Sequence, residues 1–124
     1  MHDATSAATT AVFSRALRGI QYQTGQAVLR SESYAILDEC VSIMQADPAL
    51  KVTITGHTDN VGDENRNLDL SINRAMAVKK YFESKGISAT RLVSSGQGEY
   101  RPIADNSTKD GRQQNRRVEL TGKY

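Results

Sequence analysis

A strand and a helix follow one another closely in the middle of this chain, and the helix carries an arginine on its apolar face. Polar and apolar residues alternate over Lys51–Gly56, which is typical of a half-buried strand. A helical pattern follows over Asn67–Lys85, and at 100° per residue Arg74 falls inside its apolar stripe. The stripe is expected to contain Leu70, Ala77, Val78 and Tyr81. A buried guanidinium stays protonated and needs an anion or polar groups. The pattern therefore predicts a strand–loop–helix unit with a polar cleft at its junction.

The loop between the strand and the helix supplies the acid that such a cleft needs. It begins with Gly56-His57-Thr58-Asp59, and Asp59 is the acidic residue nearest to the arginine at that junction. One acid and one base side by side suit a small zwitterion, with Asp59 binding an amine and Arg74 a carboxylate. The alternative is that Asp59 and Arg74 pair with each other and only hold the loop.

Size and composition are those of a single domain with its own core. The chain has 124 residues, of which 38% are hydrophobic and 24% charged, with a net charge of +2. We expect a domain over residues 17–124 and an extension or linker, possibly helical, over residues 1–16. Aromatic residues make up 6% of the chain, Trp is absent, and the basic residues are dispersed. Nucleic acid is therefore not an expected partner.

The N-terminal residues and the single cysteine say little about targeting. Residues 1–10 lack the basic start and apolar stretch of a signal peptide, and no segment has the length of a transmembrane span. Cys40 is mid-chain without small residues before it, which does not fit a lipid anchor. It shares an apolar stripe with Leu37 and Met44, so we expect a buried core thiol.

The remaining elements give the order β-α-β-α-β-β. A first strand is expected near residues 17–23, and a helix from Ser31 or Ser33 to about Ala46. After the second helix, which should end at Gly86, come a short strand over residues 92–96 and a long loop to residue 111. A helical turn over residues 112–115 and a strand over residues 117–121 complete the order. This predicts an α/β two-layer sandwich, with both helices on one face of a mixed sheet.

These residues resemble the OmpA-like C-terminal domain family, the peptidoglycan-binding module of OmpA, Pal and MotB-type proteins. The resemblance covers residues 19–121 and includes several motifs in matching order and spacing. The matching stretches are Gly56-His57-Thr58-Asp59, Gly62, Asn67-x-x-Leu70-Ser71-x-x-Arg74-Ala75-x-x-Val78, Gly86-Ile87, Gly96-x-Gly98-Glu99, Pro102-Ile103-Ala104-Asp105-Asn106, Gly111-Arg112 and Asn115-Arg116-Arg117-Val118-Glu119.

The resemblance implies a binding module that is not an enzyme and has no cofactor. Members of the family bind the diaminopimelate residue of the peptidoglycan stem peptide and anchor an envelope protein to the cell wall. It implies a periplasmic domain of a Gram-negative bacterium, attached to the outer membrane through a region outside this chain. The alternative is a scaffold domain of the same fold that binds a protein partner and not the wall.

The family's ligand-binding residues can be carried over onto this chain. The acidic one falls on Asp59 and the basic one on Arg74, while Asn67 is expected to bind the ligand or brace the loop. Thr58 belongs to the same motif and completes the expected diaminopimelate site. Asn115 and Arg116 are secondary candidates, with the alternative that they secure the long loop.

His57 invites a catalytic or metal-binding interpretation, which the sequence supports poorly. It lies beside Asp59, with Asp63 and Glu64 nearby, but no second His or Cys has metal-ligand spacing. A metal-assisted hydrolase is therefore the least favoured hypothesis. We expect His57 to brace the loop, and we expect no metal site and no catalytic residues.

Overall fold

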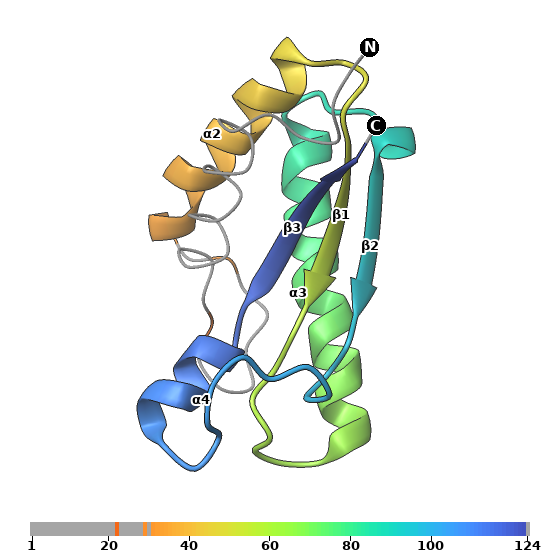
Figure 1. Ribbon diagram of the computed structural model, residues 1–124. Coiled ribbons are helices and arrows are strands. Elements are labelled where there is room, and N and C mark those ends of the chain that lie inside the picture. The colour runs from red at the N-terminus through yellow and green to blue at the C-terminus, as the bar shows by residue number, and fades with distance from the viewer. Residues whose placement is uncertain (1–21, 23–28, 30, 124) are drawn as a thin grey trace.

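The computed structural model describes Tyr22, Leu29 and residues 31–123. The expected first strand and the N-terminal extension lie outside the described residues. Three strands form one mixed sheet in the order β2-β1-β3 (Figure 1). The central strand β1 (Lys51–Gly56) is parallel to β2 (Leu92–Gly96) and antiparallel to β3 (Val118–Lys123).

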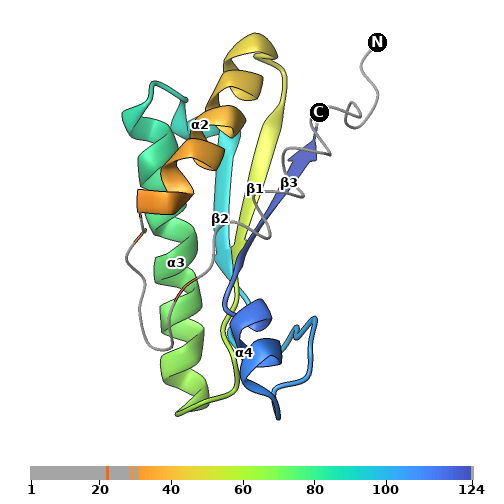
Figure 2. The ribbon, with the colours of Figure 1, turned by 90° about the vertical axis from the view of Figure 1, so that its left-hand side faces the viewer.

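Two helices cover one face of this sheet, as the sequence predicts. Figure 2 shows α2 (Ser31–Ala46) and α3 (Glu64–Ser84) on the same side of the strands. The core lies between the two layers and includes Leu37 and Cys40 from α2, with Val52 and Ile54 from β1. Cys40 is fully buried, which confirms the sequence prediction. A short 3₁₀ turn, η1 (Ala89–Arg91), precedes β2.

The bounds of α3 differ from the expected ones at the N-terminal end. The helix begins at Glu64 and not near Asn67, because the Asp63 carboxylate caps it by accepting hydrogen bonds from the backbone N–H groups of Asn65 and Arg66. At the other end, Gly86 has a φ of 93°, which is the left-handed conformation expected there.

The buried face of α3 is more polar than the sequence pattern suggested. Leu70, Ala77 and Tyr81 are only half-buried, whereas Val78 is buried as expected. The residues that α3 buries are Asn67, Ser71, Arg74, Ala75, Val78 and Phe82. The small residues of this face, Ser71 and Ala75, lie where α3 packs directly against the end of β1.

Gly56 makes this close packing possible. A Cβ atom at Gly56 would lie 1.9 Å from the carbonyl oxygen of Ser71, and one at Gly96 would lie 2.3 Å from the Ser71 Oγ. Only glycine fits at these points on the two neighbouring strands. The contact brings the buried side of α3, including Arg74, under the segment that follows β1.

The C-terminal part contains a longer helix than expected. Helix α4 covers Lys109–Asn115 because the Thr108 hydroxyl caps it at Gly111, whereas the sequence indicated a turn over residues 112–115. Strand β3 begins at Val118, one residue later than expected, and ends at Lys123.

Candidate functional site

The loop after β1 brings Asp59 into a buried and heavily hydrogen-bonded position. The carboxylate accepts a hydrogen bond from the Val61 N–H at 3.1 Å and forms an ion pair with Arg116 at 2.9 Å. Asp59 is 2% exposed. Its side chain is therefore fixed by local backbone on one oxygen and by a cation on the other.

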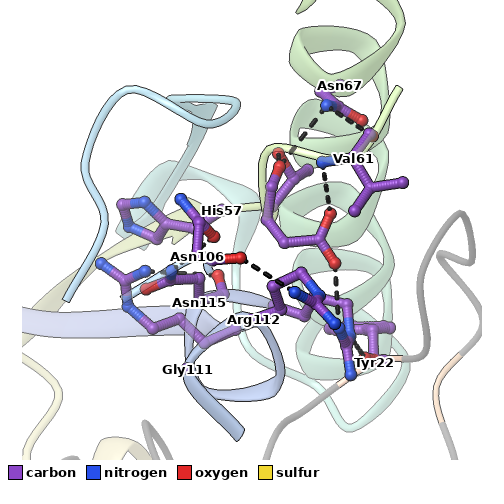
Figure 3. A network of polar contacts seen from close by, with 12 residues as sticks. Tyr22, His57, Val61, Asn67, Asn106, Gly111, Arg112 and Asn115 are labelled. Atoms are coloured by element: carbon purple, nitrogen blue, oxygen red, sulfur yellow. Dashed lines mark hydrogen bonds and ion pairs between the residues drawn. The ribbon is translucent and has the colours of Figure 1, made fainter. Parts of the chain in front are cut away.

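Thr58 and Asn67 hold the same loop. The Thr58 hydroxyl donates to the Asp59 carbonyl at 2.8 Å. The Asn67 amide donates to the carbonyls of Asp59 and Val61, and to the Glu99 carboxylate at 3.2 Å. Figure 3 shows Asn67 beside Val61 in this network. Of the two roles expected for Asn67, the structure displays the bracing one.

Arg74 is buried under the same segment. Its Nη1 donates to the His57 carbonyl at 2.9 Å, and its guanidinium carbon lies 4.7 Å from the centre of the Tyr22 ring. The pKa of Arg74 is lowered to about 10, chiefly by burial and also by the Arg116 charge, while Tyr22 and Asp59 act in the opposite direction. Arg74 therefore remains charged at neutral pH.

Arg116 joins the two sides of the cluster. Its Nε donates to the Tyr22 carbonyl at 2.6 Å, and the backbone N–H of Tyr22 donates to the Arg116 carbonyl. Burial raises the pKa of the Tyr22 hydroxyl. Two guanidinium groups and one carboxylate thus gather at the end of β1. The name cleft cluster is used below for Asp59, Asn67, Arg74 and Arg116.

Asn115, the other secondary candidate, contacts the long loop. Its side-chain oxygen accepts from the N–H groups of Ile103 and Ala104, and its amide donates to the Ala104 carbonyl and to Asn106. Figure 3 places Asn115 beside Asn106. These contacts match the alternative in which Asn115 secures the loop. The ion pair between Arg116 and Asp59 has no signal in the sequence, because these residues are 57 positions apart.

His57 turns away from Asp59. In Figure 3 its ring lies on the side of the network remote from Val61 and Asn67. The ring is 3% exposed, and its Nε2 lies 3.5 Å from a Glu119 carboxylate oxygen. Among the described residues, no group of three or more His, Cys, Asp or Glu side chains is placed to hold a metal ion. No helix in the described part is long and apolar enough to cross a membrane.

Comparison with known proteins assigns the family. The model of the OmpA family matches residues 21–116. This chain belongs to the OmpA family. It is 47% identical over 90 residues to photosystem I P700 chlorophyll a apoprotein A2 of Gloeobacter violaceus, covering 68% of this chain and 10% of that protein.

Two further relatives have names that refer to the bacterial envelope. Outer membrane porin F of Pseudomonas fluorescens is 36% identical, covering 82% of this chain and 31% of the relative. Peptidoglycan-binding protein ArfA of Mycobacterium tuberculosis is 39% identical, with the same coverages of 82% and 31%. The chain thus spans about a third or less of these relatives.

Solved structures show the same fold. The peptidoglycan-associated lipoprotein of Burkholderia pseudomallei superposes with a TM-score of 0.81 at 23% identity, covering 84% of this chain and 88% of that one. The cell wall anchor of the type VI secretion system of Pseudomonas aeruginosa gives a TM-score of 0.71 at 28% identity, covering 82% and 73%. The expected α/β sandwich of the OmpA-like domains is confirmed.

Proposed function

We propose that this chain binds peptidoglycan without catalysing a reaction, and that the cleft cluster binds the amino-acid head group at the end of the diaminopimelate side chain. The observation that carries the proposal is the convergence of the buried Arg74 with Asp59 at the end of β1. Membership of a family with relatives named for peptidoglycan binding or association supports the choice of polymer.

Each charge has a role that follows from the ligand. The ammonium group of the ligand is a three-donor cation that suits the Asp59 carboxylate. The ligand carboxylate suits a guanidinium, which offers two parallel N–H donors that a lysine lacks. Thr58 and Asn67 hold the Asp59 segment in place. Arg116, at 13% exposed, is the more accessible of the two arginines and supplies further positive charge.

A head group of this size gives weak binding at one site. We expect a dissociation constant of roughly micromolar to millimolar for the free amino acid. The cell wall presents the group repetitively, so a tethered parent protein gains effective affinity. The proposed role is therefore that of a periplasmic anchor for a membrane-attached parent whose attachment lies outside this chain.

The test is a titration with meso-diaminopimelate followed by NMR, together with co-sedimentation with purified sacculi. We expect saturable shifts at residues 58–62 and 67–75, which Asp59→Asn and Arg74→Lys both reduce at least tenfold. Lys80→Gln on the exposed side of α3 is the matched control. Circular dichroism establishes that each variant is folded. Wild-type binding by either folded variant contradicts the two-charge grip, and a defined oligomer that binds no sacculi points to a scaffold.

A further inference from the structure

A pocket lies apart from the cleft cluster, on the face of the sheet opposite α2 and α3. It has a volume of about 420 Å³, within the range of small-molecule sites. Thr55 and Glu119 are paired across β1 and β3, and the His57 N–H extends this ladder to the Arg117 carbonyl at 2.9 Å. The lining residues are Thr55, His57, Gln97, Arg101, Pro102, Ile103, Arg117 and Glu119.

The lining of the pocket contains a buried imidazole, that of His57, whose hydrogen-bonding capacity is unused. Neither ring nitrogen of His57 has a hydrogen-bond partner among the described residues. The 3.5 Å between Nε2 and Glu119 is too long for a good hydrogen bond. Burial first, and then the Arg117 charge, lower the pKa of His57 to about 4, against the opposing effect of Glu119. At neutral pH the ring thus offers one donor and one acceptor.

The charges of the pocket leave one cation uncompensated. Arg117 is 2% exposed and donates to the same Glu119 oxygen from Nε at 2.9 Å and from Nη2 at 2.7 Å, so these two charges balance. Arg101 has no ion-pair partner in the part of the chain that the structure describes, and only its carbonyl is used, by Arg117 at 2.9 Å. The pocket therefore favours a ligand with a single negative charge.

The rest of the lining defines the shape of such a ligand. The side chains of Thr55 and Gln97 contribute a hydroxyl and an amide, and within the described residues neither makes a hydrogen bond. Pro102 and Ile103 add an apolar rim, and Ile103 is 54% exposed. A short apolar group next to a carboxylate and an amide would satisfy all of these surfaces.

We propose that this pocket is a second ligand site, specific for a small monocarboxylate such as the C-terminal residue of a short peptide or a free organic acid. Arg101 binds the carboxylate, His57 and Gln97 hydrogen-bond to the polar groups beside it, and Ile103 covers the apolar part. The site stands apart from the cleft cluster and does not rest on the proposed diaminopimelate binding.

The probe is N-acetyl-D-alanine, which carries a carboxylate, an amide and one methyl group. Added at neutral pH to the ¹⁵N-labelled chain, it should shift the backbone signals of Gln97, Arg101, Ile103 and Glu119 saturably. Its neutral analogue N-acetyl-D-alaninamide should bind at least tenfold more weakly. The side-chain nitrogen signals of His57 should move with the same affinity, which reports contact without any mutation.

Arg101→Gln is the deciding variant, because Arg101 is exposed and its loss should leave the fold intact. We expect at least a tenfold loss of N-acetyl-D-alanine binding, whereas Lys80→Gln should retain it. Equal binding of acid and amide, shifts confined to residues 67–74, or full binding by Arg101→Gln would overturn the proposal. Butyrate, a monocarboxylate without an amide, separates the two sources: tighter binding of N-acetyl-D-alanine assigns a peptide terminus, and tighter binding of butyrate assigns a free acid.

Discussion

The cleft cluster and the pocket around His57 include residues from the same stretch of chain. They differ in how far their polar groups already have hydrogen-bond or ion-pair partners. On one side, Asp59 already accepts a backbone hydrogen bond and an ion pair. On the other, the His57 ring is just as buried and lacks hydrogen-bond partners among the described residues. A ligand of the cleft cluster must join or replace existing contacts, whereas a ligand of the pocket adds new ones. Neighbouring residues can thus serve sites with opposite energetic requirements.

The largest expected effect comes from Gly56→Ala, which should displace α3 and so affect the cleft cluster more than the pocket. Gly56→Ala places a methyl group 1.9 Å from the Ser71 carbonyl, which the backbone can relieve only by shifting. We expect a loss of about 3 kcal/mol or more in the free energy of unfolding, measured by urea denaturation. Diaminopimelate binding should weaken more than N-acetyl-D-alanine binding, since Arg74 lies on α3.

Gly62→Ala is the control for this substitution. Gly62 has a φ of 90° but no atom within 4 Å of an added Cβ, so only backbone strain of about 1 kcal/mol is expected. If both variants lose the same stability, close packing of α3 on β1 is not the reason for the glycine.

Low pH should destabilise the protein through protonation of His57, which lines the pocket. The folded-state pKa of His57, about 4, is below its unfolded value of 6.5, so the unfolded chain binds more protons between these values. The stability that the neutral, buried His57 contributes is fully present above pH 6.5 and is lost as the pH falls toward 4. Relative to His57→Gln, the wild type should lose roughly 2–3 kcal/mol of unfolding free energy over this window. Parallel pH profiles from urea denaturation would contradict the buried neutral imidazole.

A smaller effect is expected from the residue that secures the pocket rim. Asn115→Ala removes four hydrogen bonds to residues 103–106 and leaves partly buried backbone groups without these partners. We expect a loss of about 2 kcal/mol by thermal or urea unfolding, together with weaker N-acetyl-D-alanine binding. Asn65→Ala, at an exposed position of α3, should change neither quantity. Weakened diaminopimelate binding with unchanged N-acetyl-D-alanine binding would instead assign Asn115 to the diaminopimelate site.

The smallest effect concerns the cap of α4. Thr108→Ala removes the hydroxyl that accepts from Gly111 at 2.9 Å and should cost about 1 kcal/mol in the free energy of unfolding. Thr108→Ser preserves the oxygen and should restore most of the stability. Denaturation of the two variants side by side checks this, and equal stabilities would mean that the cap contributes nothing.

The sequence predicted the three strands and the helices α2 and α3 of the described region because their signals are local. Alternation identified β1, and Gly86 identified the end of α3. The buried position of Arg74 was also predicted, since Arg74 falls inside the apolar stripe of the helical pattern, although most other residues assigned to that stripe are only half-buried. The start of α3 was missed by a turn because Asp63 acts as its cap, a role that several nearby polar residues could equally have taken.

Contacts between distant segments were beyond the reach of the sequence pattern. The ion pair of Arg116 with Asp59 depends on the register between β1 and β3. That register places Thr55 opposite Glu119 and so creates the pocket. No local periodicity encodes it, and His57 was accordingly expected only to brace the loop.

The antiparallel pairing of β1 with β3 also determines when the sheet can fold during synthesis. During synthesis β1 emerges from the ribosome well before its partner, because Gly56 pairs with Val118 about sixty residues later. Until then one edge of the central strand is open, and neither Arg116 nor Glu119 has reached its place. Sequence-distant pairing of this kind slows folding. Both sites should therefore be absent until β3 has been synthesised, and they should appear together when β3 pairs with β1.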